Sequence, residues 1–211
     1  MNLAPVADVN TNPHNPIIGS RAFSENPEQA AVLSRAMADG LSAEQIIPVF
    51  KHFPGHGDTA EDSHLQLAVS HKSRQQMESC EWIPFHGAKK QDGIMVGHIA
   101  VPEITEDSTP ASMSPTLVTE VLKEELGFEG LIMTDALEMK AITQTYTPAE
   151  AALNALQAGC DILLMPENFQ EAFDGVLSAV ESGDYPEEKL DRAVLKILRF
   201  KEKWGILNLH K

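Results

Sequence analysis

Residues 46–64 have the sequence IIPVFKHFPGHGDTAEDSH, and they contain both the clearest strand signal and the densest chemistry of the chain. The stretch begins with an apolar run that is typical of a buried strand and that ends in Lys51 and His52. A proline and two glycines then exclude regular structure from the following loop, which holds further histidines and aspartates. We therefore predict a strand that presents a polar loop at its carboxyl end.

Apolar segments elsewhere in the chain predict four more strands. They are residues 3–9, 93–101, 131–134 and 162–165. The segment 93–101 (GIMVGHIAV) shows no alternation of apolar and polar residues, which is expected of a strand buried on both faces.

Helices are predicted between these strands and after the last one. They span residues 27–40, 73–90 with a break near Pro84, 115–127, 148–159, 169–182 and 187–204. Their start signals are clear, because Ser114 precedes Pro115 and because Thr147, Pro148 and Glu150 form a capping box. The apolar stripe of the last helix is expected to pack against the core.

Five strand and helix units in strict alternation predict an α/β fold with a parallel sheet. An open doubly wound sheet and a closed barrel both fit this pattern. Polar residues follow the carboxyl ends of several predicted strands, namely Asp8, Lys51, His52, His98 and Asp135. A barrel gathers such ends around one mouth, so the barrel is favoured.

Charge and composition narrow the range of partners. The formal net charge of −15 disfavours a surface that binds nucleic acid or anionic lipid. No stretch approaches the roughly 18 apolar residues that a membrane span needs. The two cysteines, Cys80 and Cys160, lack the spacing of a disulfide framework or a zinc site. We expect no nucleic acid partner and no membrane span, whereas a cytoplasmic, periplasmic or secreted location stays open.

The loop after the second predicted strand allows several interpretations. Residues 55–60 (GHGDTA) match a dinucleotide-binding pattern weakly, because no apolar helix follows them. Metal-ligand residue types are also present, at His52, His56, Asp58, Asp62 and His64. The proline and glycines between the first two histidines exclude a helical ligand pair, so a metal site would depend on the loop alone. A solvated surface loop is a third alternative.

A fourth interpretation of the same loop is proton transfer. Asp62 and His64 lie two residues apart, and a carboxylate that binds one imidazole nitrogen raises the basicity of the other. Asp135 ends the apolar segment 131–134 and is either a helix cap or a carboxylate able to attack an electron-poor carbon. His98 is either a hydrogen-bonded core histidine or part of the same site.

Two motifs taken together resemble glycoside hydrolase family 3. They are KHFPGHGDTAEDSH at residues 51–64 and GFEGLIMTDALEM at residues 127–139. The resemblance is closest to the β-N-acetylhexosaminidase branch that acts in bacterial peptidoglycan recycling. Residues 2–27 (NLAPVADVNTNPHNPIIGSRAFSENP) and 158–166 (AGCDILLMP) resemble the same branch, so the resemblance covers nearly the whole chain.

The resemblance implies a role for each of six residues. Asp135 is implied to be the nucleophile, and His64, supported by Asp62, the acid and base. The remaining three, Arg21, Lys51 and His52, are implied to hold the sugar. No cofactor and no metal are implied.

The implied reaction is retaining hydrolysis in two displacements, which removes terminal β-linked N-acetylglucosamine from peptidoglycan fragments or chitooligosaccharides. Asp135 would attack the anomeric carbon while His64 protonates the departing oxygen. A β-glucosidase or an N-acetylglucosaminide phosphorylase of the same family are the alternatives within this class. An inactive fragment or a sugar-binding remnant is the alternative from another class.

The resemblance also implies a (β/α)8 barrel of the TIM type, of which the five predicted strands correspond to the last five. We therefore expect residues 1–211 to form one catalytic domain of the family's N-terminal type, with an incomplete barrel. The family's first three strands, with their DxEGGR segment, have no counterpart here. A partner chain or a preceding segment is expected to complete the barrel, and activity of these residues alone is expected to be impaired.

Overall fold

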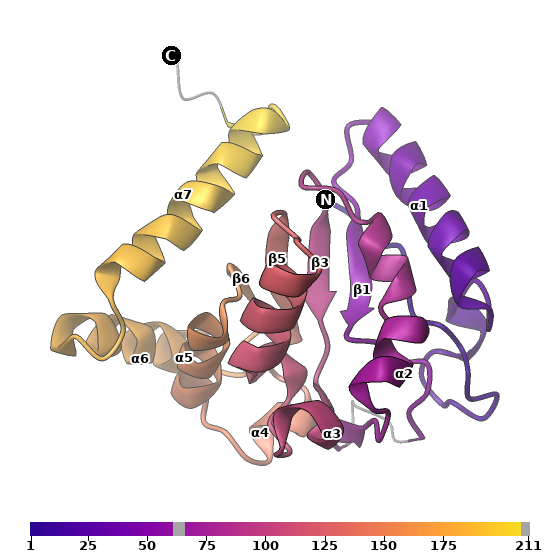
Figure 1. Ribbon diagram of the computed structural model, residues 1–211. Helices are drawn as coiled ribbons and strands as arrows, with labels where there is room; N and C mark the ends of the chain where they lie inside the picture. The colour runs from indigo at the N-terminus through magenta and orange to yellow at the C-terminus, as the bar shows by residue number, and fades with distance from the viewer. Residues whose placement is uncertain (61–65, 208–211) are drawn as a thin grey trace.

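The computed structural model describes residues 1–60 and 66–207. Its main sheet contains four parallel strands in the spatial order β1-β3-β5-β6 (Figure 1). These strands are β1 (Val49–Phe53), β3 (Gly93–Val96), β5 (Leu131–Ala136) and β6 (Ile162–Leu164). A small second sheet pairs β2 (Ala68–Val69) with β4 (Ile99–Ala100). The α/β fold with a parallel sheet is confirmed, and among the described residues the sheet is open.

Helices connect the strands and cover the outer face of the sheet. The α-helices are α1 (Pro27–Ala43), α2 (Arg74–Ser79), α3 (Pro102–Thr105), α4 (Lys140–Thr143), α5 (Pro148–Ala158), α6 (Phe169–Ser182) and α7 (Glu187–Lys203). Three short 3-10 turns are η1 (Gly19–Arg21), η2 (Ile83–Gly87) and η3 (Ala111–Met113), and η4 (Thr116–Glu125) is a helix with π-type hydrogen bonds. None of the helices in the described ranges is long and apolar enough to cross a membrane.

Local sequence signals explain where several helices begin. The Thr147 hydroxyl accepts a hydrogen bond from the Glu150 amide, and the Glu150 carboxylate binds the Thr147 amide in return. Ser114 Oγ accepts a hydrogen bond from the Leu117 amide at 3.3 Å. These contacts satisfy amide groups that a helix leaves without partners at its start.

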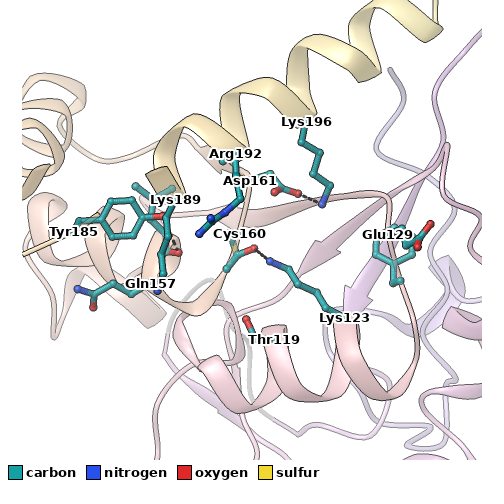
Figure 2. Close-up of a pocket in the computed structure, with 14 residues that line it drawn as sticks. Thr119, Lys123, Glu129, Gln157, Cys160, Asp161, Tyr185, Lys189, Arg192 and Lys196 are labelled. Atoms are coloured by element: carbon teal, nitrogen blue, oxygen red, sulfur yellow. Dashed lines mark hydrogen bonds and ion pairs between the residues drawn. The ribbon is translucent and has the colours of Figure 1, made fainter. Parts of the chain in front are cut away.

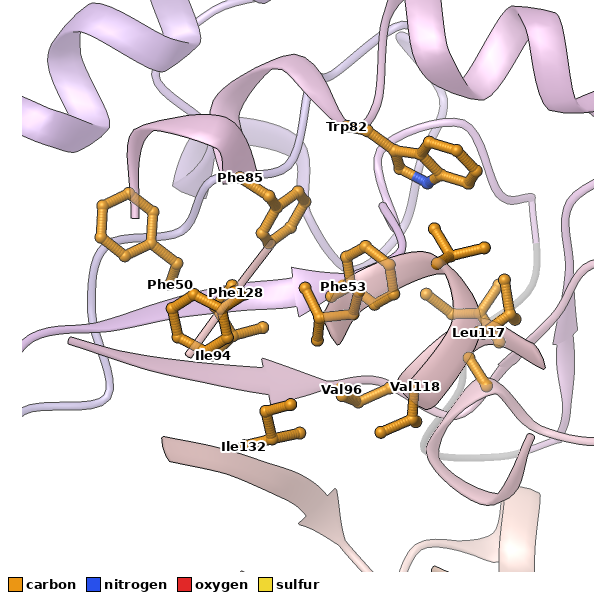
Figure 3. Close-up of a cluster of buried hydrophobic side chains, with 14 of the residues drawn as sticks. Phe50, Phe53, Trp82, Phe85, Ile94, Val96, Leu117, Val118, Phe128 and Ile132 are labelled. Carbon is orange, nitrogen blue, oxygen red and sulfur yellow. The ribbon is translucent and has the colours of Figure 1, made fainter. Parts of the chain in front are cut away.

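Both faces of the main sheet are buried, as the continuous apolar runs predict. Successive strand residues point to opposite faces. Aromatic and aliphatic side chains on the outer face pack under the helices, as Figure 3 shows for Phe50, Phe53, Ile94, Val96 and Ile132. The inner face carries a second cluster of Val49, Met95 and Met133.

Two strand predictions are wrong in part. The predicted strand 3–9 forms only isolated bridges, in which Asn2 pairs with Pro48 and Val6 with Lys51. Pro5 lies between the two bridges and has no amide hydrogen for a ladder. The predicted strand 93–101 divides into β3 and β4, and the short strand β2 was not predicted.

The last helix packs less deeply than its apolar stripe predicts. Phe200 is buried against Ile47 and Leu131, whereas Val194 of the same stripe is 46% exposed. In Figure 1, α7 lies beside the amino ends of the strands. This placement packs Ile197 and Phe200 against the starts of β5 and β6, while Lys196 pairs with Asp161 just before β6.

Candidate active site

The register of the sheet places Lys51 and Asp135 at the same end of the sheet, toward the carboxyl ends of their strands. Lys51 is level with Met95, and Met95 is level with Met133. Asp135 lies two residues beyond Met133, so it shares the inner face with Met133 and lies at the carboxyl end of β5. Lys51 likewise shares the inner face with Val49. Two of the predicted site residues therefore meet on one face of the sheet.

Asp8 connects the segment before α1 to the loop after β1. Its side chain is fully buried, and its Oδ2 lies 2.7 Å from His52 Nδ1. The backbone amides of His52 and His56 both donate to the Asp8 carboxylate, at 3.2 Å and 2.7 Å for the contacts to Oδ1. Burial by itself would raise the pKa of Asp8, but attraction and hydrogen bonding from His52, with a smaller contribution from His56, lower it overall.

Lys51, one of the predicted sugar-binding residues, lies within electrostatic reach of both Arg21 and Asp135. Burial lowers the pKa of the half-buried Lys51, and repulsion from Arg21 lowers it further, whereas Asp135 and Asp8 act in the opposite direction. Arg21 is exposed and donates from Nη1 to the Ile17 carbonyl at 3.3 Å. Lys51 thus lies within electrostatic reach of Arg21, Asp135 and Asp8, and His52 contacts Asp8 directly.

The loop that follows β1 is held by side chains inside it and beside it. His56 is buried, and its Nδ1 lies 2.6 Å from Thr59 Oγ1. The buried Asn15 side chain donates to the carbonyl oxygens of His56 and Thr59 at 2.8 Å and 2.9 Å. Burial is the main cause that lowers the pKa of His56, which favours its neutral form.

Close packing explains both glycines of this loop. A Cβ atom at Gly57 would lie 1.9 Å from the Val9 carbonyl oxygen, and one at Gly55 would lie 2.5 Å from Glu81 Cγ. Gly55 also has a φ of +129°, which side-chain-bearing residues rarely adopt. The glycines of GHGDTA therefore allow the loop to pack against neighbouring chain, and a phosphate is not needed to explain them.

Asp62 and His64, the predicted acid–base pair, lie outside the described residues. In the described loop immediately before them, Asp58 forms an ion pair with Lys72, with 3.5 Å between Oδ1 and Nζ. Lys72 also forms an ion pair of 2.5 Å with Glu81, which is fully buried. Within residues 1–60 and 66–207, no group of three or more His, Cys, Asp or Glu side chains is placed to hold a metal ion.

His98 is a hydrogen-bonded core histidine, which was one of its two interpretations. Its Nε2 lies 2.9 Å from the Ala136 carbonyl and its Nδ1 2.8 Å from Ser112 Oγ. A carbonyl can only accept, so Nε2 carries the proton and Nδ1 accepts from the hydroxyl. Burial is the main cause that lowers the pKa of His98.

Sequence reasoning placed Asp8 at a strand end but gave it no role, and it missed Asn15 and Glu81. The position of Asp8 after an apolar segment was the available signal. Asn15 lies in a loop rich in Asn and Pro, where nothing in the sequence separates a buried amide from an exposed one. The partners of Asn15 lie 41 and 44 residues away, in the loop after β1, whereas Glu81 pairs with Lys72 only nine residues before it, on the other side of α2.

Comparisons with known proteins agree with the arrangement of the strands. The model of the glycosyl hydrolase family 3 N terminal domain matches residues 1–200. Beta-hexosaminidase A of Pseudoalteromonas piscicida is 33% identical over 96% of this chain and 38% of its own length.

Two solved structures match almost the whole chain. The glycoside hydrolase family 3 beta-N-acetylglucosaminidase of Paenibacillus sp. str. FPU-7 superposes with a TM-score of 0.94 and 36% identity, over 100% of this chain and 42% of its own. A beta-glucoside phosphorylase superposes with a TM-score of 0.91 and 29% identity, over 97% of this chain and 39% of its own. The chain thus spans about two fifths of the length of the proteins it matches here.

Proposed function

Since the chain belongs to glycosyl hydrolase family 3, we propose that it acts as a retaining β-N-acetylhexosaminidase. The substrate would be a terminal β-linked N-acetylglucosamine of peptidoglycan fragments or chitooligosaccharides. One observation carries the proposal: Asp135 lies at the end of β5 on the same sheet face as Lys51, and Lys51 is within electrostatic reach of both Asp135 and Arg21. A carboxylate at a strand end with a cation close by suits attack on a sugar whose hydroxyl groups the cation holds.

The role of Asp135 is that of the nucleophile. Its Oδ1 accepts a hydrogen bond from the Ala136 amide at 2.8 Å, which orients the carboxylate. Its side chain is partly exposed at the carboxyl edge of the sheet, so a sugar can approach it. Attack on the anomeric carbon would give a glycosyl–enzyme intermediate, and a second displacement by water would retain the configuration.

We assign substrate binding to Arg21, Lys51 and His52. Asp8 fixes the His52 ring through Nδ1, which leaves Nε2 as the ring nitrogen able to meet a sugar hydroxyl. Lys51 and Arg21 supply donors to the oxygen atoms of the sugar. His64, oriented by Asp62, would protonate the leaving oxygen and then activate water.

The test compares hydrolysis of an aryl β-N-acetylglucosaminide with hydrolysis of the aryl β-glucoside. We expect the N-acetylglucosaminide to react faster, with the activity lost in Asp135→Ala and in His64→Ala. Faster glucoside turnover would replace the proposal with a β-glucosidase. Binding of N-acetylglucosamine without turnover of either glycoside would favour the sugar-binding alternative.

A phosphorylase is the second candidate, and the similarity to a beta-glucoside phosphorylase favours it. A neutral imidazole as acid and base does not repel phosphate as a carboxylate would. Formation of sugar 1-phosphate that depends on added phosphate would establish phosphorolysis. Hydrolysis at an unchanged rate with and without phosphate would reject it.

We further propose that residues 1–211 work as one catalytic domain of the family's N-terminal type, with its faces covered by additional polypeptide. Val32 on α1 is 68% exposed, and Phe169 and Phe173 on α6 are 71% and 53% exposed. Apolar side chains of this size gathered on helix faces favour burial against another surface. A partner chain or further barrel strands would cover them.

A further inference from the structure

Helix α7 carries a basic stripe along one face. Its members recur at alternating spacings of three and four residues, so they lie on the same side of the helix. They are Lys189, Arg192, Lys196, Arg199 and Lys203. A row of cations on one face is unexpected in a chain with a formal net charge of −15.

The first three residues of this basic stripe line a pocket of about 510 Å³. Figure 2 shows Lys189, Arg192 and Lys196 extending from α7 toward the pocket, with Lys123 extending from η4 opposite. Asp161, which immediately precedes β6, also lines the pocket. The pocket therefore lies at the amino ends of the strands, at the edge opposite to Asp135, and is separate from the candidate active site.

Two of the four cations have structural partners. Lys196 Nζ pairs with Asp161 Oδ2 at 2.7 Å, and the same oxygen accepts from the Ile132 amide. Lys123 Nζ donates to the Gly159 carbonyl at 2.5 Å, which satisfies a backbone group at the end of α5. No carboxylate pairs with Lys123 among the described residues.

The other two cations, Lys189 and Arg192, have no structural partner among the residues that the structure describes. Within the described part of the chain, the side chains of Lys189 and Arg192 make no hydrogen bond and no ion pair. Besides Asp161, the pocket is lined by one further carboxylate, Glu129, which Figure 2 shows at the far side from Arg192. Four cations and two carboxylates leave two positive charges in excess.

We propose that this pocket binds a small phosphorylated molecule, a phosphate monoester or a diphosphate. The guanidinium of Arg192 offers paired donors that match phosphate oxygens, and the lysines add point charges. The volume falls within the range of small-molecule sites. A long polyanion such as nucleic acid is disfavoured, because the formal net charge of −15 of the whole chain would repel it.

Such a ligand would connect α7 to η4 and thereby stabilise the fold. A ligand that binds only the folded state raises the midpoint of thermal unfolding in a concentration-dependent manner. The inference goes beyond the proposed function, and binding is measured without any glycoside.

The test uses inorganic pyrophosphate in isothermal titration and thermal unfolding, with ionic strength matched by sodium chloride. We expect saturable binding and a rise of the unfolding midpoint in the wild-type chain. Lys189→Gln and Arg192→Gln should each raise the dissociation constant at least about tenfold, since each removes a charged hydrogen bond. Lys189→Arg should retain binding.

Lys201→Gln is the matched control, because Lys201 is exposed on the same helix but lies off the basic stripe. Its dissociation constant should stay within about twofold of wild type. Absence of saturable binding to the wild-type chain would overturn the proposal. Equal weakening by all three glutamine variants would also overturn it, since that result indicates general charge attraction. Far-ultraviolet circular dichroism would verify that each variant is folded.

Discussion

Asp8 organises part of the candidate site at the scale of single residues, because its buried carboxylate holds both His52 at the end of β1 and His56 in the following loop. We predict that Asp8→Asn lowers the free energy of unfolding at pH 7 by about 2–4 kcal/mol, since charge-assisted hydrogen bonds in a buried site are lost. Urea denaturation measures this change. The control is Asp39→Asn, at an exposed carboxylate that pairs with Lys89 on the surface.

The effect of Asp8 should depend on pH in one direction. Its folded-state pKa lies below the ordinary value of 3.8, so its contribution is present above about pH 4. That contribution is lost as the pH falls through the folded-state pKa. The difference in stability between wild type and Asp8→Asn should therefore shrink in acid, and a difference that grows below pH 4 would contradict this assignment.

His98 should make the fold sensitive to mild acid. Its pKa in the folded state lies below the ordinary value of 6.5, so the unfolded chain binds a proton that the folded chain does not. Stability should thus fall as the pH decreases below about 6.5, by at most about 1.4 kcal/mol per pH unit for one proton. Denaturation of wild type and His98→Gln from pH 7.5 to 5 should show a smaller slope in the variant. Equal slopes would place the titrating group elsewhere.

Lys72 forms an ion pair with the fully buried carboxylate of Glu81. Removal of one partner from a buried ion pair leaves the other charge without compensation, so Lys72→Met should destabilise the fold by about 3–5 kcal/mol. Lys89→Met is the matched control, because Lys89 pairs with Asp39 on the surface and should matter by less than about 1 kcal/mol. Similar losses in the two variants would show that Glu81 does not depend on Lys72.

At the scale of elements, the glycines offer a matched pair of substitutions. Gly57 lies against the backbone of Val9, whereas Gly40 lies within α1 with nothing within 4 Å of an added Cβ. Gly57→Ala should displace the loop and reduce glycosidase activity as well as stability. Gly40→Ala should stabilise α1 by about 0.5–1 kcal/mol. Denaturation and activity assays on both variants distinguish packing at Gly57 from a general preference for alanine.

Much of the element pattern could be predicted because helix starts and buried strands depend on local chemistry. The capping box at Thr147 and the apolar runs of β5 and β6 correspond closely to the observed bounds. The break between β3 and β4 was not predicted; it contains His98, whose side chain contacts Ser112 and Ala136. These partners are distant in the sequence, and no periodicity reports them.

The candidate site was predictable to the same extent. Strand ends indicated Lys51, His52 and Asp135, and the family resemblance added Arg21; the fold places Lys51 within electrostatic reach of Arg21 and Asp135. The contacts of Asp8 with His52 and His56 could not be predicted, since these hydrogen bonds reach across 44 and 48 residues. The proposed acid–base pair, Asp62 and His64, stays a prediction.

At the scale of the whole molecule, polar side chains gather at both ends of the strands of the open sheet. Asp135 and Lys51 lie at the carboxyl ends of the strands, and the proposed phosphate pocket lies at their amino ends. The exposed apolar faces of α1 and α6 lie to the sides. This arrangement allows sugar chemistry, anion binding and contact with further polypeptide to occupy separate surfaces.

The covalent intermediate is the most direct test of the proposed function. In His64→Ala, an aryl β-N-acetylglucosaminide with a good leaving group should still react once, while release of the sugar becomes slow. Mass spectrometry of the digested protein should then find one N-acetylglucosaminyl group on the peptide that contains Asp135. The label should be absent from His64→Ala/Asp135→Ala. Release of the aryl group without a label on Asp135, or a label on another residue, would contradict the assignment of Asp135 as the nucleophile.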